Sequence, residues 1–396
     1  MLSSFRRFSS QLSSWFFSLL FILLAASQVL PAEANSAPIL IVSQAQQLSM
    51  FDGQAQSILA SFNFPFPLHE KIWRSSDDQF AYLSSPEGWL IQVDLQAGVI
   101  RRQLRVAQQT TGIALSADDR YLMVANSRPT TLIALNAVDF SLIRKLEVKD
   151  KNGKASAVAA IHSATARKSF IAVMRDIPEL WEMSYDEHAE PVYEGFVHDY
   201  KMGEGIALRG PFPPRRTLLE QPLRHVLFDA DATHAIGAGE NGLHQIINLN
   251  IRRKILEFTL SSSTLANAGL IVQRGKQSLL LLPSATQNTL FLIDMLSGQL
   301  LNTLDTTAPP RSLMQDPRND DIWLNHPTDS STAEFFVEQV ILPVAGSPVR
   351  LLRPNRQLLA RSNDVQNIIV HGDDEKEFLI IDSKTWQLLR RLRIPP

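Results

Sequence analysis

The chain has 396 residues, a formal net charge of −2 at pH 7, 45% hydrophobic residues and no cysteine. The near-neutral charge excludes a general nucleic-acid-binding protein, because such proteins need a basic excess to follow the phosphate backbone. The absence of cysteine excludes disulfides, thiolate metal sites, a lipid-modified cysteine and covalently bound c-type haem in this chain. The length is enough for two or three average domains or for one large domain built from repeats.

Residues 1–34 have the pattern of a secretory signal peptide. A positive start (Arg6-Arg7) precedes an apolar run at about 15–26, and a small-x-small cleavage motif follows at 32–34. The apolar run is shorter than the roughly 20 residues that a membrane-spanning helix needs. We therefore expect an exported, periplasmic protein whose mature chain is 35–396, with an uncleaved membrane anchor as the alternative.

A pattern of two β-rich runs joined by an Asp or Asn turn recurs along the mature chain. The clearest copies are WLIQVD at 89–94, TLIALN at 131–136, TLFLID at 289–294 and EFLIID at 377–382. Each copy predicts a strand, a tight turn and a partner strand. Weaker copies lie near Asp52, Asp186, Asn248 and Glu338. The resulting eight copies are spaced by roughly 42 to 62 residues, which is typical of four-stranded propeller blades.

Between these copies, a Ser/Asp-rich turn precedes a further strand, as in SSDDQFAYL at 75–83 and SADDRYLMVAN at 116–126. No long stretch of the mature chain has helical periodicity. The sequence therefore predicts a single all-β domain over 35–396, an eight-bladed β-propeller. The Pro-rich stretch 210–216 interrupts the rhythm and predicts an insertion or long loop.

Three nearly continuous stretches are not explained by blade geometry: ARKSF at 166–170, DIPELWEMSYD at 176–186 and AEPVYEGFVHDYKMGEG at 189–205. This run resembles the family that contains the haem d1 domain of cytochrome nitrite reductase and the haem d1 biosynthesis propeller. Thinner similarity covers most of the mature chain, including 245–254. The family fold is an eight-bladed propeller, in agreement with the repeats, and the resemblance implies haem d1 or its precursor as a cofactor.

In that family, a histidine after the first blade binds the haem d1 iron from the proximal side. His69, in the stretch 67–73, matches this position. A neutral imidazole is a suitable axial iron ligand when its other nitrogen is held by a hydrogen-bond partner. The resemblance therefore implies that His69 is the metal ligand, and the alternative is an ordinary surface or turn histidine.

The distal side departs from the family pattern. The family's Pro-His-Leu-Gly-Ser-Gly stretch is replaced here by 261–269, a second family histidine falls near Asp316, and a third is absent from 358–362. In the reductase, distal histidines protonate nitrite at the iron, a general-acid role suited to imidazole. Their loss predicts that this chain is not a nitrite reductase, and it weakens the case for the cofactor itself.

Haem d1 and its precursors carry carboxylates, which arginine binds in bidentate fashion. The resemblance therefore implies a basic and aromatic cofactor-binding set beside His69. Its members are Arg167, Lys168, Arg175, His198, Tyr200 and Arg216, with Lys201 and Arg215 nearby. The alternative is a solvated loop whose charges are balanced by neighbouring acidic residues. The other histidines, such as His162, His225 and His234, are expected to be strand or turn residues and not ligands.

The resemblance thus implies a periplasmic haem d1-type tetrapyrrole-binding propeller that acts in haem d1 biosynthesis or maturation for denitrification. It implies a late side-chain oxidation, a dehydrogenase step, on a haem d1 precursor. The candidate protein partners are other haem d1 maturation proteins or the nitrite reductase, with no nucleic acid among them. The rival hypothesis is a cofactor-free propeller that serves as an interaction scaffold. One structural observation would separate the two hypotheses. If His69 and the basic set converge on one funnel-shaped opening of the propeller, the tetrapyrrole-binding hypothesis is favoured over the scaffold.

Overall fold

The computed structural model describes residues 40–44, 46–194, 206–239, 242–275, 277–306, 308–315, 322–326, 337–341, 349–353, 358–361, 367–371, 376–385 and 387–394. Residues 1–37 and 38–396 form two units, and every described residue belongs to the second. The predicted signal peptide and its cleavage site lie outside the described residues. Among the described residues, no helix is long and apolar enough to cross a membrane.

The described residues are almost entirely β-strands and turns, with two short 3-10 helices, η1 (Thr165–Arg167) and η3 (Ala266–Ala268). This confirms the predicted all-β class. In the described part of the chain, most strands form four-stranded antiparallel sheets in which neighbours in sequence pair with each other. The blade pattern predicted from the sequence is therefore present as sheets, and the order of strands in each sheet follows the chain.

The strands of the first sheets are β1 (Leu40–Gln44), β2 (Gln47–Phe51), β3 (Ile58–Asn63); β4 (Trp73–Arg74), β5 (Phe80–Ser84), β6 (Trp89–Asp94), β7 (Val99–Arg105); β8 (Gln109–Leu115), β9 (Tyr121–Arg128), β10 (Thr131–Asn136), β11 (Leu142–Glu147). The next sheets contain β12 (Val158–Ala164), β13 (Ser169–Met174), β14 (Glu179–Ser184), β17 (Pro214–Leu218); β18 (His225–Phe228), β19 (His234–Ala238), β20 (Leu243–Asn248), β21 (Arg253–Thr259). The last sheets contain β22 (Leu270–Arg274), β23 (Gln277–Pro283), β24 (Thr289–Asp294), β25 (Leu300–Asp305); β26 (Ser312–Gln315), β27 (Ile322–Asn325), β28 (Val337–Ile341), β29 (Val349–Arg353); β30 (Leu358–Arg361), β31 (Asn367–His371), β32 (Glu377–Asp382), β33 (Leu388–Arg393). A separate hairpin pairs β15 (Tyr193–Glu194) with β16 (Ile206–Ala207).

The recurring Asp or Asn residues close the turn between the third and fourth strands. Asp94 Oδ1 accepts a hydrogen bond from the Ala97 amide at 2.7 Å, and Asp294 Oδ1 accepts one from the Ser297 amide at 2.9 Å. The short side chain of Asp mimics a backbone turn in this way. The turn chemistry predicted from the repeats is therefore confirmed in these sheets.

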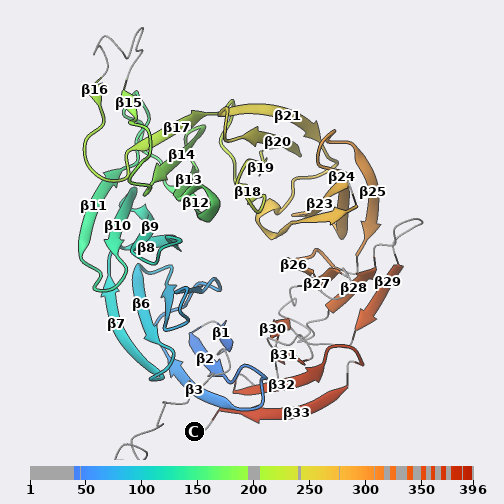
Figure 1. Cartoon of the computed structure of the whole chain (residues 1–396). Coiled ribbons are helices and arrows are strands. Elements are labelled where there is room, and N and C mark those ends of the chain that lie inside the picture. Colours follow the sequence, from blue (N-terminus) through green and yellow to red (C-terminus); the bar gives the residue numbers. More distant parts are fainter. Residues whose placement is uncertain are drawn as a thin grey trace, which may run out of the picture. The chain divides into compact units, whose positions relative to one another are not determined.

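The hydrophobic core lies between the faces of successive sheets. Leu90 of β6 packs in one cluster with Leu122 of β9, and the same kind of contact recurs from sheet to sheet. The last sheet packs on the first, because the Phe51 and Phe378 rings meet edge-on with centroids 5.0 Å apart. Within residues 38–396, Figure 1 shows the sheets following one another around a ring. The seven residues of β7 are all exposed, as expected for an outermost strand.

Antiparallel pairing places the loops on two opposite faces of this ring. The connections between sheets and the turns between second and third strands share one face, as the 2.9 Å bond from the Arg175 amide to the Ala157 carbonyl illustrates. The remaining turns share the other face, where the Leu95 amide donates to the Gln79 carbonyl at 2.8 Å. We call these the connection face (64–72, 85–88, 148–157, 175–178) and the hairpin face (75–79, 95–98, 116–120, 165–168).

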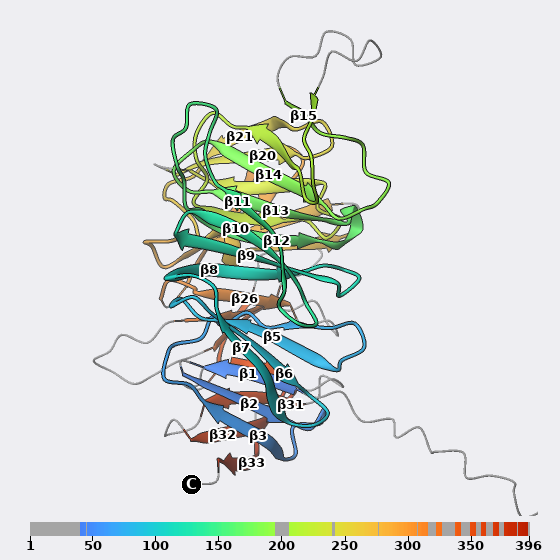
Figure 2. The ribbon, with the colours of Figure 1, turned by 90° about the vertical axis from the view of Figure 1, so that its left-hand side faces the viewer.

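The segment between β14 and β17 replaces a short turn with residues 185–213 and carries β15 and β16, which extend beyond the sheets in Figures 1 and 2. This agrees with the insertion that the Pro-rich stretch predicts. The stretch itself divides, because 210–213 lies in the insertion whereas Pro214 begins β17. A proline is tolerated there because β17 is the edge strand of its sheet.

Candidate functional site

His69 lies on the connection face, in the link from β3 to β4. Its Nδ1 is 2.9 Å from the Ser84 hydroxyl, and its amide donates to the Ser84 carbonyl at 2.8 Å. The Ser43 hydroxyl donates to the His69 carbonyl at 3.2 Å. These bonds fix both the loop and the ring plane. When Nδ1 carries the proton and donates it to Ser84, the Nε2 lone pair remains for a metal ion.

Burial sets the protonation state of His69. It lowers the pKa of the imidazole below its ordinary value, and a hydrogen bond to Ser84 partly opposes this. The ring is therefore neutral at pH 7, which is the form that coordinates iron. The described residues place no hydrogen-bond partner at Nε2. The local geometry of His69 accordingly fits the role that the resemblance implies.

A second polar group beside His69 was missed by the sequence analysis. The Lys71 ammonium lies 4.2 Å from the centroid of the Trp73 ring, and Trp73 Nε1 donates to the Ile113 carbonyl of β8 at 2.7 Å. Desolvation by the surrounding protein lowers the pKa of Lys71. The cation is thus held on an indole face, and because the side chain is exposed, it is accessible to a carboxylate. Lys71 was overlooked because a lone lysine in a turn has no distinguishing sequence signal.

His162 lies on β12, the first strand of its sheet, and was expected to be an ordinary strand residue. Its ring stacks on Phe228 of β18, with centroids 4.3 Å apart and planes 14° apart. Burial, and secondarily the charge of Lys71, lower the pKa of His162 to about 4. Lys71 and His162 therefore influence each other electrostatically, although they come from different sheets. At neutral pH, His162 is an uncharged hydrogen-bonding group.

Arg175 shares the connection face with His69. Its guanidinium Nε is 3.6 Å from Asp176 Oδ1, and the side chain is 52% exposed. This ion pair is long and solvated, so it holds the arginine weakly. Of the predicted basic set, Arg175 is the described member that the structure places on the same face as His69.

Arg167 and Lys168 lie on the hairpin face, at the opposite end of β13 from Arg175. A strand of six residues spans about 20 Å, so the two ends cannot contact one small ligand together. Arg167 donates to both carboxylate oxygens of Glu182, at 2.9 and 3.1 Å, and Lys168 lies 3.4 Å from Asp186. The structure therefore does not bring these two residues together with His69.

Arg216 lies on β17, at the far edge of its sheet from β12. Its guanidinium carbon is 4.5 Å from the Trp181 ring centroid, and Nη1 is 3.6 Å from Glu179 Oε2. Trp181 Nε1 donates to the same Glu179 oxygen at 2.6 Å. Arg216 thus belongs to an outer cluster and not to the His69 group. His198, Tyr200 and Lys201 lie outside the described residues.

The stretch 261–269, which stands where the family has a distal histidine, forms a connection-face loop around η3. His244 Nδ1 donates a hydrogen bond to the Gly242 carbonyl at 2.7 Å, and its Nε2 accepts one from the Thr264 hydroxyl at 2.8 Å. Burial lowers the pKa of His244 to about 4. Asn267 of this loop bonds His225, whose pKa burial also lowers. The side chains of this loop thus carry amide and hydroxyl groups. Asp316 and Ser362, at the other two places where the family has a histidine, lie outside the described residues.

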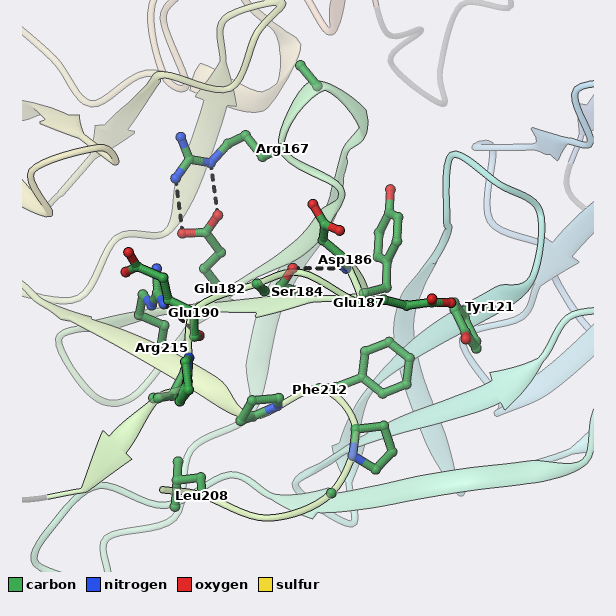
Figure 3. Close-up of a pocket in the computed structure, with 18 residues that line it drawn as sticks. Tyr121, Arg167, Glu182, Ser184, Asp186, Glu187, Glu190, Leu208, Phe212 and Arg215 are labelled. Carbon is green, nitrogen blue, oxygen red and sulfur yellow. Dashed lines mark hydrogen bonds and ion pairs between the residues drawn. The ribbon is translucent and has the colours of Figure 1, made fainter. Parts of the chain in front are cut away.

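Three cavities border the described residues of the insertion, and one of them, of about 460 Å³, is lined by Lys168 and 185–188. Figure 3 shows the first, of about 660 Å³, with the Arg167–Glu182 ion pair at one side. Phe212 lies on another side and meets Tyr121 edge-on, with ring centroids 5.1 Å apart. The second cavity, of about 650 Å³, lies beside it and is lined by Arg216 and Trp181 among others. Three members of the predicted set, Arg167, Lys168 and Arg216, therefore lie near the insertion.

Residues 34–200 match the family model described as the Cytochrome D1 heme domain. The chain is 24% identical to the dihydro-heme d1 dehydrogenase of Pseudomonas aeruginosa over 272 residues, which cover 68% of this chain and 51% of that protein. The chain thus spans about half the length of that relative. It is 24% identical to Protein NirF of Stutzerimonas stutzeri over 333 residues, which cover 82% of this chain and 80% of that protein.

Among solved structures, the dihydro-heme d1 dehydrogenase NirN in complex with DHE superposes with a TM-score of 0.78 and 21% identity. The superposition covers 91% of this chain and 74% of that chain, and it shows a shared propeller-like fold. Together these matches confirm that the chain resembles the haem d1 propeller family.

Proposed function

We propose that this chain binds haem d1 or a precursor of it, and that it acts in haem d1 biosynthesis or maturation for denitrification. The observation that carries the proposal is the His69 imidazole, which is neutral and held at Nδ1 by Ser84. Both residues lie within the stretch that matches the haem d1 family model. The name of one curated relative, the dihydro-heme d1 dehydrogenase, supports the same ligand class.

The residues on the connection face fit such a ligand. His69 would hold the iron through Nε2, and Lys71 and Arg175 would attract the ligand's carboxylates. When bound, the macrocycle would supply an iron centre and a conjugated system able to accept electrons. Arg167 and Arg216 fit less well, because Glu182 and Glu179 already pair with them. The rival scaffold hypothesis is not favoured, since the chain matches the Cytochrome D1 heme domain model and a relative named dihydro-heme d1 dehydrogenase.

We propose further that the chain is not itself a nitrite reductase. A proton donor for nitrite needs a pKa near the working pH. His162 has a pKa of about 4 and cannot serve as a general acid at pH 7. In the loop 261–269, where the family has a distal histidine, Thr264 is buried against His244 and Asn267 is exposed. Reconstituted protein supplied with an artificial electron donor should therefore make no nitric oxide from nitrite, and sustained production would contradict this part of the proposal.

The finer architecture is also a proposal. We expect each sheet to be one blade of an eight-bladed propeller, with a signal peptide at 1–34 and a periplasmic mature chain. The packing of the last sheet on the first supports a closed ring. Mass spectrometry of the native protein should find a mature terminus at Asn35, and an intact Met1 would support the membrane-anchor alternative.

The ligand proposal is tested by titrating the purified mature chain with haem d1 and following visible absorption. The parent should bind with a distinct spectrum, and His69→Ala should shift the spectrum and weaken binding at least about tenfold. His188→Ala is the matched control, because His188 is exposed and lies in the insertion. A parent that does not bind, or a His69→Ala variant with an unchanged spectrum, would overturn the proposal.

A further inference from the structure

The described parts of the insertion, 185–194 and 206–213, stand against the outer strands of the sheet and are anchored at defined points. Arg144 of β11 donates to the Pro211 carbonyl, and Arg215 of β17 donates to the Glu190 carbonyl at 3.2 Å. The Leu208 amide donates to the Val192 carbonyl at 2.8 Å. Residues 190–192 and Leu208, which this hydrogen bond joins, line the first and second cavities and so form the wall between them. The second cavity, of about 650 Å³, we call the outer basic cavity.

The lining of the outer basic cavity is strongly positive. It contains five cations and two carboxylates, a formal excess of three positive charges: Arg144, Lys151, Arg215, Arg216 and Arg252 against Glu147 and Glu190. One of the two carboxylates, Glu147, is already engaged by Lys149 at 2.6 Å. In the described part of the chain, no carboxylate pairs with Arg144, Lys151, Arg215 or Arg252. The uncompensated charge is unusual for a chain whose net charge is −2.

Arg216 and Trp181 form one wall of the outer basic cavity. The guanidinium is stacked on the indole, and its buried Nη1 atom makes no hydrogen bond among the described residues, with Glu179 Oε2 3.6 Å away. The carboxylate therefore compensates the charge of Arg216 without accepting a close hydrogen bond, and an oxyanion of a ligand would supply a closer acceptor. Burial also lowers the pKa of Arg144 at another wall, as expected in a concave, partly desolvated place.

We propose that the outer basic cavity binds a small molecule that carries several carboxylate or phosphate groups. Arginine forks match both kinds of oxyanion, and a cavity of this size is in the range of small-ligand sites. The site is distinct from the proposed haem d1 site, because its lining comes from β11, β17 and the insertion among others and includes none of His69, Lys71 and Arg175. The inference therefore goes beyond the proposed function and does not depend on it.

Two probes separate the two sources of anionic groups. Citrate offers three carboxylates, pyrophosphate offers phosphate oxygens, and acetate is the singly charged control. Calorimetric titration of the mature chain at low salt should give one site for citrate or pyrophosphate, with at least about tenfold tighter binding than for acetate. The affinity should fall as salt is raised, because the attraction is electrostatic. Equal, weak binding of all three probes would overturn the proposal.

A pair of double variants tests the location. Lys151→Gln with Arg252→Gln removes two cavity charges and should weaken the preferred probe about tenfold or more. Glutamine is chosen because Arg252 has a φ of 53°, and exchanging one long side chain for another leaves that backbone cost unchanged. The matched control is Lys145→Gln with Arg253→Gln, which removes two adjacent charges outside the lining. Lys145 follows Arg144 in β11, so it points to the opposite face of the strand.

A third set of variants separates this site from the haem d1 site. A variant that keeps both positive charges, Lys151→Arg with Arg252→Lys, should bind the probe again. His69→Ala should leave it unchanged, because the two sites do not share residues. The bound probe should also raise the melting temperature of the parent and of the matched control, but not of the cavity variant. If the matched control weakens binding as much as the cavity variant, general surface charge explains the binding and the proposed site is wrong.

Discussion

The Ser84 hydroxyl lies 2.9 Å from His69 Nδ1, although the two residues are 15 positions apart in the chain. Ser84 ends β5, and His69 lies in the link that leads to β4. The hydroxyl fixes the plane of the ring, and when Nδ1 donates its proton to the hydroxyl, Nε2 is left without a proton and can bind a metal ion. Ser84 is therefore a positioning residue for the proposed iron ligand.

Replacing Ser84 by alanine tests this relationship. Partners that orient a metal-bound histidine typically contribute 10- to 100-fold in affinity, so Ser84→Ala should weaken haem d1 binding by about that factor. Ser43→Ala is the matched control, because Ser43 bonds the His69 backbone and not its ring. The control should bind within about threefold of the parent in absorption titrations, since it leaves the ring bond intact. Equal losses in the two variants would mean that the loop, and not the ring orientation, determines affinity.

The ion pair between Arg167 and Glu182 predicts a structural role for Arg167. Both side chains are mostly buried, with 19% and 15% exposure. Glu182→Ala should lower the free energy of unfolding by about 2 kcal/mol, because the guanidinium loses its partner. Lys168→Ala should cost less than about 0.5 kcal/mol, since its side chain is 60% exposed.

Urea unfolding measures both changes. In the same variants, absorption titration should find haem d1 affinity unchanged, because the pair lies on the hairpin face. A tenfold loss of affinity in Arg167→Ala without loss of stability would instead favour the cofactor role that the resemblance implies for this residue.

The buried His244 predicts that stability depends on pH. Its pKa is lowered from 6.5 to about 4, so the unfolded chain takes up a proton more readily than the folded one. The stabilisation is therefore complete above pH 6.5 and is lost as the pH falls toward 4, on the order of 1–3 kcal/mol. Urea unfolding at several pH values should give a shallower slope in this window for His244→Gln than for the parent. The exposed His188→Gln should retain the parent slope, and parallel slopes for all three proteins would refute the prediction.

The contact between the first and last sheets predicts a large effect on stability. Phe378 is 1% exposed and its ring meets Phe51. Phe378→Ala should lower the free energy of unfolding by about 3–5 kcal/mol, through lost burial and the cavity that remains. Leu389→Ala is the control, because Leu389 is 55% exposed and should change stability by less than about 0.5 kcal/mol. A small effect of Phe378→Ala in denaturant unfolding would mean that this interface contributes little to the fold.

The strands and turns were predictable because their signals are local. The Asp94 turn and the Ser75 turn are closed by side chains within a few residues, so alternating hydrophobicity and turn residues suffice to predict them. The packing of each sheet on the next follows from the repeat itself. The same reasoning predicts an insertion or long loop at the Pro-rich stretch 210–216, because the spacing of the copies is widest there.

The composition of the site was less predictable. Lys71 and His162 are far apart in sequence and influence each other only after the ring has formed. Glu182 pairs with Arg167 across a hairpin, which no motif reveals. The basic residues around 167–175 look like one set in sequence, but antiparallel pairing places them on two faces. His69 could be identified because its neighbourhood resembles a known family.

The closure of the ring has a consequence for how the chain can be reconnected. Among the described residues, each sheet is built from one continuous stretch, and the first and last sheets meet through side chains such as Phe51 and Phe378. Leu40 and Ile394, near the two ends of the described chain, belong to the same hydrophobic cluster. Joining these ends by a short linker and opening the chain at an exposed turn between sheets would therefore create a circular permutant with the same interfaces. In such a permutant the covalent chain would cross the present junction of the first and last sheets, and the junction without a covalent connection would move to wherever the new termini are placed.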